Sequence, residues 1–440
     1  MLIPLVPGSG APPVRVAIIG AGFIARGLVH RLARRPTMAP PILLSRRLGP
    51  ALEILSRAGY GQSGSVTTSQ DPRVLSEAVA AGRPAVTTDP DVLPEVSGID
   101  VVVEATGAVD HGTRVMLDAL RAGRHVVSMN AEADALLGHH LDAVAAAHGA
   151  TYSIADGDQP GVLLRMMDET RHLGLDIAVA LNCKRNLDVH QTRAHSRPYA
   201  ERDGTSVEMT TSFGDGTKMH IENVVTANRS GLTVPPFGTP GVETNLERAA
   251  SDVHEAGIAS GTVHFTLGGD FGGGVLILAR SGDPDFDAPR LRMLKMGDGP
   301  WYPLFRPYHL TFMEVPVTIE QLAAGGPALG QRVRTPTAVC VTIAKRDVAA
   351  GTELDGIGGD LCYGMAAAAE EGAELLPIGL AEHATLRRDV PQDEPISRDD
   401  VELDEDAFIV QLVRAAASSA SGQEGAPDEA SGPQREERPV

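Results

Sequence analysis

The stretch GDGPWYPLFRPYHL, residues 297–310, places a cation and an imidazole among closely spaced aromatic side chains. Arg306 offers a rigid fork of hydrogen-bond donors for a carboxylate or a phosphate. His309 carries an imidazole, whose ordinary pKa suits proton transfer near neutral pH. Only 4% of the residues are aromatic, yet four of them fall within positions 301–308. We therefore expect either a substrate-binding ribbon that includes Arg306, Tyr308 and His309, or an interface or core cluster with a structural arginine.

A second chemical signature lies near the N-terminus, where VAIIGAGFIARG (16–27) follows the G-x-G-x-x-A pattern. The first glycine permits a tight turn, the second lets a pyrophosphate approach the backbone, and the small third residue allows close helix–strand packing. The N-terminus of the following helix offers free N–H groups and a partial positive charge. The pattern predicts a dinucleotide site, with a glycine-rich turn that binds nothing as the alternative. We expect five residues to contact the cofactor: Gly20, Gly22, Phe23, Ile24 and Ala25.

The residues after the second predicted strand, PILLS (41–45), bear on the choice of dinucleotide. NAD-binding proteins usually carry a carboxylate near this point for the ribose 2′-hydroxyl, whereas a basic residue accommodates the 2′-phosphate of NADP. Arg46 and Arg47 stand here, so we expect NADP to be preferred, with NAD as the second choice. The alternative is that both arginines are solvated at the start of a helix.

Two further segments should reach the same ligand-binding edge, because the carboxyl ends of parallel strands meet there. They are VVEATG (102–107) and SMN (128–130). The cofactor contacts expected from them are Glu104, Ala105, Thr106, Gly107 and Asn130.

The chain divides into regions of different texture, and the fold class we expect is α/β. Strand and helix patterns alternate over 14–155, which predicts a doubly wound Rossmann domain. Strand-like runs separated by Gly and Asp turns over 156–335 predict an α+β catalytic domain with a largely antiparallel sheet. Short strands and turns over 336–412 predict a small β module. We expect a flexible leader over 1–13 and a disordered tail over 413–440, where few apolar residues remain.

Composition excludes several classes of protein. The formal net charge is −19, whereas nucleic-acid-binding proteins carry a basic stripe, so we expect no nucleic-acid partner. The three cysteines lie far apart and form no C-x-x-C pair, which argues against structural zinc and disulfides and favours the cytoplasm. No apolar run approaches the roughly 20 residues that span a membrane, so we expect no membrane partner.

Several polar stretches in the second and third regions together resemble a known family. They are TSFGDGTKMHIE (211–222), VTANRSGL (225–232), MGDGPWYPLFRPYHLTFMEVP (296–316) and AKRDVAAGTELDGIGG (344–359). On these stretches the chain resembles the 1-deoxy-D-xylulose 5-phosphate reductoisomerase-like enzymes, which are related to homoserine dehydrogenases and end in a SAF domain. The resemblance implies an NAD(P)-dependent oxidoreductase that acts on a small sugar- or polyol-derived carbonyl compound. It also implies a homo-oligomer.

One departure from the family bears on the substrate. Lys184 is kept in LNCKR (181–185), but HQTR (190–193) stands where relatives show a YRNP-like tetrad. We therefore do not carry over a phosphorylated pentulose as the substrate. Standard reductoisomerases use a divalent cation, but the His and Asp residues here match no standard ligand spacing. A metal stays open, and we name no ligands for it.

The resemblance implies catalytic roles for further polar residues. Lys184 would stabilise developing negative charge or pass a proton, with a solvated surface charge as its alternative. Lys218 and Glu222 lie four apart in EMTTSFGDGTKMHIENVV (208–225), which we expect to be strand-like, so they would share one face. An ordinary ion pair is the alternative for them. The remaining candidates are Asn228, for a substrate hydroxyl, and Lys295 and Asp298, with turn closure by Asp298 as the alternative.

Three functions remain open at this point. The first is an NADP-preferring oxidoreductase, with or without an isomerisation, in which Lys184 or His309 handles the proton and Arg306 anchors an anionic group. The second is a homoserine dehydrogenase-like enzyme, although DGDQPG (156–161) is a poor match to the turn expected there. The third is a non-catalytic dinucleotide sensor that binds a partner through its terminal module.

Overall fold

The computed structural model describes residues 12–61, 66–269 and 272–422. All but the last two residues of the expected leader lie outside these ranges, as does the tail after 422. Within the described ranges, no helix is long and apolar enough to cross a bilayer.

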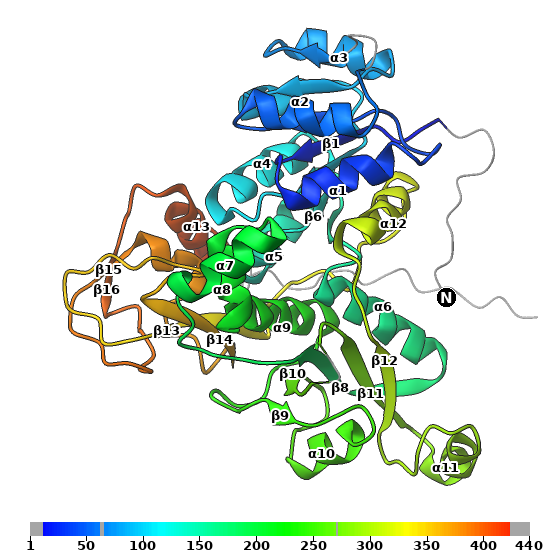
Figure 1. Ribbon diagram of the computed structural model, residues 1–440, viewed down its shortest axis with the longest axis vertical. Coiled ribbons are helices and arrows are strands. Elements are labelled where there is room, and N and C mark those ends of the chain that lie inside the picture. Colours follow the sequence, from blue (N-terminus) through cyan, green and yellow to red (C-terminus); the bar gives the residue numbers. More distant parts are fainter. Residues whose placement is uncertain (1–11, 62–65, 270–271, 423–440) are drawn as a thin grey trace, which may run out of the picture.

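The N-terminal region is the expected doubly wound domain (Figure 1). Its seven parallel strands lie in the order β3-β4-β2-β1-β5-β6-β7, so the strand order reverses between β1 and β5. Every residue of β1 and β5 is buried, which explains their continuous apolar sequences. The strands are β1 (Val16–Ile19), β2 (Ile42–Leu44), β3 (Thr67–Thr68), β4 (Ala85–Thr87), β5 (Val101–Glu104), β6 (His125–Ser128) and β7 (Tyr152–Ile154). The helical segments are α1 (Phe23–Leu32), α2 (Leu48–Arg57), α3 (Pro72–Ala80), η1 (Pro90–Glu95), α4 (Val109–Arg121) and α5 (Ala131–Ala147).

The second domain is a five-stranded sheet with helices, in the order β12-β11-β8-β10-β9. The sheet is mixed, because β8 is antiparallel to β11 but parallel to β10. Its strands are β8 (Leu175–Lys184), β9 (Val242–Glu243), β10 (Thr262–Leu267), β11 (Val275–Ser281) and β12 (Tyr302–Arg306). Its helices are α6 (Gln159–His172), α7 (Arg193–Asp203), α8 (Val207–Gly214), α9 (Thr217–Ser230), α10 (Ala249–Glu255) and α11 (Pro284–Met293).

The segment 208–225 is helical, so the prediction of strand-like structure there is wrong. It lies in α8 and α9, and every residue of α9 except Ser230 is buried. A helix that is buried on all sides shows no amphipathic stripe, so its period cannot be recognised from apolar spacing. Gly231, which follows α9 at φ 76°, is the local signal that marks the helix end.

Helix α12 (Thr311–Ala323) returns from the second domain to pack on α1 (Figure 1). Val315, Ile319 and Leu322 join the core cluster that contains the apolar face of α1. The rings of Phe23 and Phe312 meet edge to face, with centroids 5.8 Å apart. The helix that opens at the glycine-rich loop and the chain that follows the aromatic ribbon are therefore in contact.

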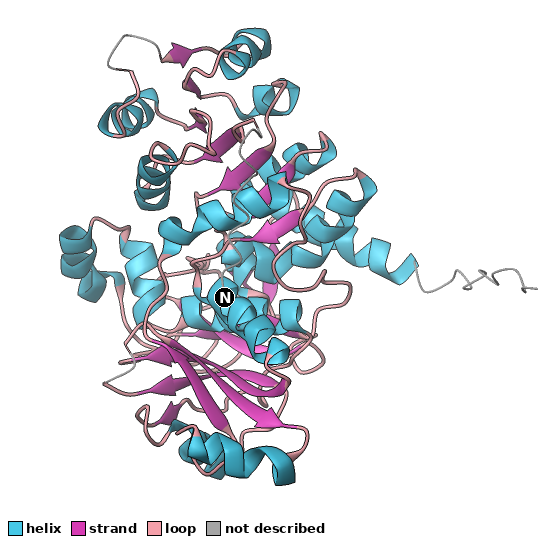
Figure 2. Cartoon of the chain, turned by 90° about the vertical axis from the view of Figure 1, so that its right-hand side faces the viewer, coloured by secondary structure: helices cyan, strands magenta, loops and turns pink. Residues whose placement is uncertain are grey.

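The C-terminal region forms small antiparallel sheets, as expected (Figure 1). They are separate from the five-stranded sheet of the second domain, which is seen in the lower half of Figure 2. The elements of the C-terminal region are β13 (Ala338–Ala344), β14 (Cys362–Ala368), η2 (Ile378–His383), β15 (Ala384–Leu386), β16 (Val401–Leu403) and α13 (Phe408–Gly422). Because α13 extends to Gly422, the prediction of disorder from 413 is wrong for 413–422. Leu412 and Ala416 of this helix are buried, so packing against the folded protein orders a segment whose composition suggested a disordered tail.

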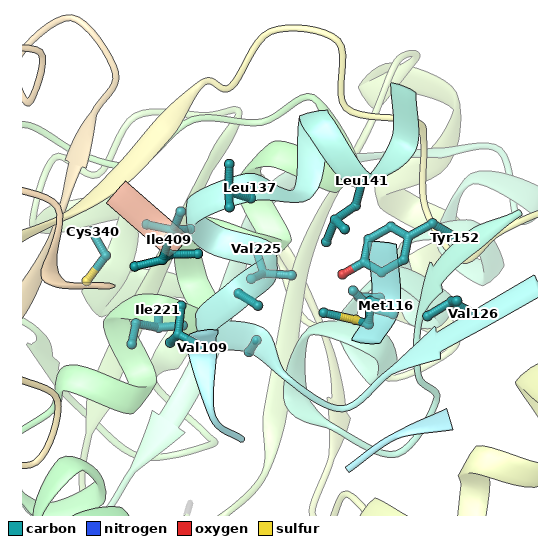
Figure 3. Packing of buried hydrophobic residues seen from close by; sticks show 14 of the residues in the cluster. Val109, Met116, Val126, Leu137, Leu141, Tyr152, Ile221, Val225, Cys340 and Ile409 are labelled. Atoms are coloured by element: carbon teal, nitrogen blue, oxygen red, sulfur yellow. The ribbon is translucent and has the colours of Figure 1, made fainter. Parts of the chain in front are cut away.

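The three regions share one hydrophobic core. Side chains from α5, α9, β13 and α13 pack in a single buried cluster. Figure 3 shows four of them, Leu137, Ile221, Cys340 and Ile409, one from each of these elements. Helix α9 therefore contacts both the Rossmann domain and the C-terminal module.

A buried ion cluster crosses the same core. Arg229 of α9 is fully buried, and its guanidinium lies 2.5 Å from Asp134 Oδ2 and 3.3 Å from Asp142 Oδ2, both on α5. Its Cζ lies 5.0 Å from the centre of the Tyr152 ring. Asp142 Oδ2 also accepts a hydrogen bond from the backbone N–H of Val333 at 2.8 Å. Burial raises the pKa of Asp142 to about 6, against the opposing effect of Arg229, so the charge of this carboxyl depends on its partners.

Candidate active site

The glycine-rich loop lies at the end of β1 and opens helix α1. Gly20 has φ 113°, and a Cβ there would lie 3.1 Å from the carbonyl oxygen of Ala105. Gly22 is the N-cap of α1 without a side-chain cap bond, and a Cβ placed on it would meet no atom within 4 Å. The first turn of α1 therefore faces open space with its N–H groups available, which fits a pyrophosphate. That turn consists of Phe23, Ile24 and Ala25.

The open space at Gly22 leads to a direct prediction. In Gly22→Val the side chain should occupy the space of the pyrophosphate without disturbing the fold. We expect the Kd for dinucleotide, measured by fluorescence titration, to rise at least about 10-fold, or ~1.4 kcal/mol. The matched control is Gly282→Val, since a Cβ on Gly282 also meets no atom within 4 Å but lies between β11 and α11 in the second domain. Equal dinucleotide affinity in the two variants would contradict the prediction.

The turn after β5 forms the next part of this edge. Glu104 is fully buried and accepts hydrogen bonds from the Thr106 N–H, at 2.8 Å, and from the Thr106 hydroxyl. Burial raises the pKa of Glu104 to about 7. Asn130 accepts from Ala133 N at 3.0 Å and donates to Ala108 O at 3.0 Å. Glu104 and Asn130 thus support the turn from the protein interior. Ala105 is buried as well, so the surface of the turn is formed by Thr106 and Gly107.

Arg46 and Arg47 follow β2 and are both exposed. The Ser45 hydroxyl donates to Arg47 O at 3.0 Å, and Arg47 is the N-cap of α2. Among the described residues neither arginine takes part in an ion pair. Both guanidinium groups can therefore meet an incoming phosphate.

A group of charged side chains lies at the carboxyl edge of the Rossmann sheet. Lys184 ends β8, whereas Lys218 and Glu222 lie one turn apart on α9. Glu132 lies in the first turn of α5, after β6, and Asp158 is the N-cap of α6, after β7. Lys218 Nζ is 2.9 Å from Glu132 Oε1, and the two side chains are only 7% and 3% exposed. This pair joins the second domain to the edge at which a dinucleotide binds.

The electrostatics of this group suit proton transfer. Burial lowers the pKa of Lys184, although the carboxylates of Glu222 and Asp215 oppose that shift. Burial also raises the pKa of Glu222 to about 8, with Asp158 adding to the rise and Lys218 opposing it. Glu222 therefore holds its proton to a higher pH than an ordinary carboxyl, and Lys184 gives up a proton more readily than an ordinary lysine. Groups with pKa values shifted towards neutrality are suited to general acid–base catalysis.

The aromatic ribbon divides into two parts. Trp301 is buried, with its ring centroid 4.8 Å from that of His254, and Tyr302 is buried at the start of β12. The structure thus supports the core-cluster alternative for this part of the ribbon. Arg306 forms an ion pair with Glu314 and lies 4.9 Å from the centre of the Tyr308 ring. An anionic substrate would have to compete with Glu314 for this arginine.

The end of the ribbon comes close to the charged group. His309 Nδ1 lies 3.2 Å from the carbonyl oxygen of Gly157, next to Asp158. A Cβ on Gly157 would lie 2.2 Å from Thr311 O, so the two backbones are in tight contact. His309 is therefore placed beside the second-domain edge of the site, whereas Tyr308 is half exposed.

Three other candidates lie elsewhere. Asn228 accepts hydrogen bonds from Thr337 N and Ala338 N at 2.8 and 3.0 Å, so its amide anchors β13. Lys295 follows α11, and the 82% exposed Asp298 pairs with Arg292 of that helix. Figure 1 shows α11 at the end of the molecule opposite the Rossmann domain. We do not retain Asn228, Lys295 or Asp298 in the site.

Sequence reasoning missed two carboxylates of the group. Glu132 comes two residues after Asn130, which was recognised as the end of a strand, so the strand-end rule could have found it. Asp158 lies in DGDQPG (156–161), which was set aside as a poor match to another family's turn. Its place at a helix N-cap after a buried strand was the available signal.

A cavity of about 370 Å³ adjoins this group. It lies between the turn after β5, helix α8 and the C-terminal module, and Glu132 lines it. Other lining residues are Thr106, His111, Met209, Ile357 and Glu382. Within the described residues, no cluster of three or more His, Cys, Asp or Glu side chains could hold a metal ion.

Comparison with known proteins now bears on the activity. Residues 20–155 match a family model described as "Homoserine dehydrogenase, NAD binding domain", and residues 157–315 match one described as "Oxidoreductase DRL, catalytic domain". The chain is an NAD(P)-dependent oxidoreductase. A nicotinamide dinucleotide is thereby confirmed as its cofactor class. No curated protein matches the chain.

Three solved structures illustrate the similarity of this oxidoreductase to known folds. A putative NADPH-dependent oxidoreductase from Desulfitobacterium hafniense is 11% identical, with a TM-score of 0.42 over 73% of this chain and 91% of that one. A homoserine dehydrogenase from Thiobacillus denitrificans is 16% identical, with a TM-score of 0.38 over 75% and 82%. A 1-deoxy-D-xylulose 5-phosphate reductoisomerase from Zymomonas mobilis, in complex with NADPH, is 14% identical, with a TM-score of 0.35 over 71% and 80%. At these scores the substrate must be argued from the site itself.

Proposed function

We propose that this oxidoreductase prefers NADP and reduces a small, polar, sugar- or polyol-derived carbonyl compound, with or without a prior isomerisation. The observation that carries the proposal is the group of Lys184, Lys218, Glu132, Glu222 and Asp158 at the carboxyl edge of the Rossmann sheet. Lys218, Glu132 and Glu222 are buried, whereas Lys184 and Asp158 are half-buried. Buried charges with perturbed pKa values are typical of catalytic sites. The family resemblance and the match to an oxidoreductase DRL catalytic domain support this substrate class.

Each residue of the group has a distinct part in the proposed reaction. When bound, the nicotinamide ring supplies the hydride that reduces the carbonyl carbon. Lys184 stabilises the negative charge that develops on the carbonyl oxygen and donates a proton to it. Glu222, whose pKa is raised by burial, returns a proton to Lys184. Lys218, held in place by Glu132, orients a substrate hydroxyl, and His309 is the second candidate proton donor.

A turnover assay tests the substrate class. Purified protein is mixed with NADPH and a panel of hydroxyaldehydes, ketoses and their phosphate esters, each with and without Mg²⁺. Oxidation is followed at the absorbance band of the reduced nicotinamide. We expect turnover with at least one polar carbonyl compound. Binding of NADPH without turnover across the whole panel would overturn the proposed substrate class.

The NADP preference is tested at the end of β2. The double variant Arg46→Glu/Arg47→Glu places two carboxylates where a 2′-phosphate would bind. We expect the Kd for NADPH to rise roughly 10- to 100-fold, because a charge-assisted contact is lost and repulsion is added. The Kd for NADH should change far less, since it lacks the phosphate. An equal change for both dinucleotides would show that the arginines are only solvated.

A second candidate activity is supported by the N-terminal match to a homoserine dehydrogenase domain. It is tested by adding homoserine and NADP⁺ to the same assay. We also propose that the enzyme is a homo-oligomer, as the family resemblance implies, which light scattering on the purified chain will decide. The non-catalytic alternative is set aside, since both family models describe oxidoreductase domains.

A further inference from the structure

Lys345 of the C-terminal module reaches into the second domain. It directly follows β13 and is only 3% exposed. Its Nζ donates hydrogen bonds to Asp215 Oδ2 at 2.7 Å, to Gln191 O at 3.0 Å and to Gly359 O at 2.6 Å. All three donors of the ammonium group are therefore used, and one of them neutralises a carboxylate that is itself fully buried.

Asp215 stands immediately before the catalytic helix α9. Its Oδ1 accepts a hydrogen bond from Thr217 N, the first residue of α9, at 2.8 Å. The C-terminal module contacts the same turn a second time, because Gly364 N of β14 donates to the Thr217 hydroxyl at 2.8 Å. Gly216, the N-cap of α9, has no side chain to cap the helix. The first turn of α9 is therefore fixed from outside its own domain.

That first turn carries the proposed catalytic groups. Lys218 is the second residue of α9, and Glu222 follows one turn later. The carboxylate of Asp215 also acts on Lys184, together with Glu222 and Lys218. Any shift or change of charge at Asp215 should therefore affect both the position of α9 and the ammonium of Lys184.

We propose that the C-terminal module is part of the active site, and that Lys345 is a positioning residue that acts through Asp215 on Lys184 and Lys218. The inference rests on the proposed function for the roles of those two lysines. The alternative is that the Lys345–Asp215 pair only docks the C-terminal module onto the second domain, and two observations weigh against it. Buried ion pairs contribute little net stability, and Arg193 already ties α7 to the module through Gly358 O at 3.2 Å.

The test compares variants that change this pair with one that changes docking alone. Lys345→Met by itself leaves Asp215 buried and unpaired and can fail to fold, so the main variant is Asp215→Asn/Lys345→Met. The charge-conserving variant is Lys345→Arg. The docking control is Arg193→Gln, which removes side-chain contacts to the same module without touching Asp215. Circular dichroism establishes that each variant is folded.

We expect kcat of the double variant to fall roughly 10- to 100-fold, because small displacements of catalytic groups have effects of this size. The Kd for NADPH should stay unchanged, because the further hydrogen bonds of the pair go to Gln191, Gly359 and Thr217 and not to the glycine-rich loop. Lys345→Arg should retain more activity than the double variant, and Arg193→Gln should be close to wild type. A double variant with wild-type kcat, or an equal loss in Arg193→Gln, would overturn the inference.

A second readout separates this inference from the proposed function. The rate at which an amine-selective reagent modifies Lys184 is followed against pH by peptide mass spectrometry. The groups that face Lys184 are Glu222, Asp215, Lys218, His220 and the ring and carbonyl oxygen of Phe213. The variant Asp215→Asn/Lys345→Met removes the Asp215 charge. In it the midpoint of the modification rate of Lys184 should move to lower pH, since that carboxylate raises the pKa of Lys184. An unchanged midpoint contradicts the inference even if no substrate of the wild-type enzyme is found.

Discussion

Replacing Arg229 with methionine is expected to lower the free energy of unfolding by about 3–5 kcal/mol, the usual result of removing one partner from a buried ion pair. The guanidinium is fully buried and is shared by Asp134 and Asp142. Without it, two carboxyls remain in the core without the ion-pair partner that offsets their desolvation. Arg229 lies on α9 with Lys218 and Glu222, so a loosened α9 should also displace these two groups and lower the activity per milligram. Urea denaturation followed by circular dichroism measures the effect.

Two further variants show whether the buried charge is the cause. The combination Asp134→Asn/Asp142→Asn/Arg229→Met removes all three charges and should recover part of the loss, because no buried charge is left unpaired. Arg414→Gln breaks an exposed pair with Glu405 and should cost no more than about 1 kcal/mol. If Arg229→Met were as stable as Arg414→Gln, the cluster would contribute nothing to holding α5 and α9 together.

Replacing Lys184 with methionine should lower kcat by roughly 10²- to 10⁴-fold, the range typical for loss of a general acid or base. The side chain ends β8, and burial lowers its pKa, so it gives up a proton more readily than an ordinary lysine. Methionine keeps much of the length of the lysine side chain but has no proton to donate. The Kd for NADPH should stay near that of the wild type, because the glycine-rich loop is untouched.

The control for this variant is Lys295→Met. Lys295 is an exposed lysine beside α11, far from the charged group, so its loss should leave kcat unchanged. Steady-state kinetics with the best substrate from the panel, at several pH values, provides the comparison. If the Lys184→Met enzyme had the kcat of the wild type, another group would have to donate the proton. His309 is the candidate for that role.

The cofactor half of the enzyme was the more predictable half. Gly20 is glycine because its φ is positive, and Gly22 keeps the space beside the first turn of α1 open. The G-x-G-x-x-A spacing of one short segment predicts both. The strands of this sheet are buried on both faces, so their sequences are continuously apolar. Where burial or backbone conformation alone decides the residue type, the structure can be predicted from a single sequence.

The catalytic half was less predictable, because its residues are defined by distant partners. Lys218 and Glu222 lie on one face, as the spacing predicts. Their segment is a helix and not the expected strand, but residues four apart share a face of a helix as well. Glu132 pairs with Lys218 from 86 positions away, and Lys345 pairs with Asp215 from 130 positions away. No local pattern encodes such pairs. Trp301 and Tyr302 show the opposite situation, because their aromatic density is compatible with either a site or a core cluster, and it serves the packing of a sheet edge.

The return of α12 to the Rossmann domain has a consequence for how this chain is made. As the nascent polypeptide leaves the ribosome, residues 14–155 emerge long before Val315, Ile319 and Leu322, which complete their core. The N-terminal domain therefore cannot complete its core before α12 has been synthesised. Until then the apolar face of α1 stays exposed to solvent. A chain truncated after 155 should therefore aggregate, because the apolar face of α1 has no partner in it.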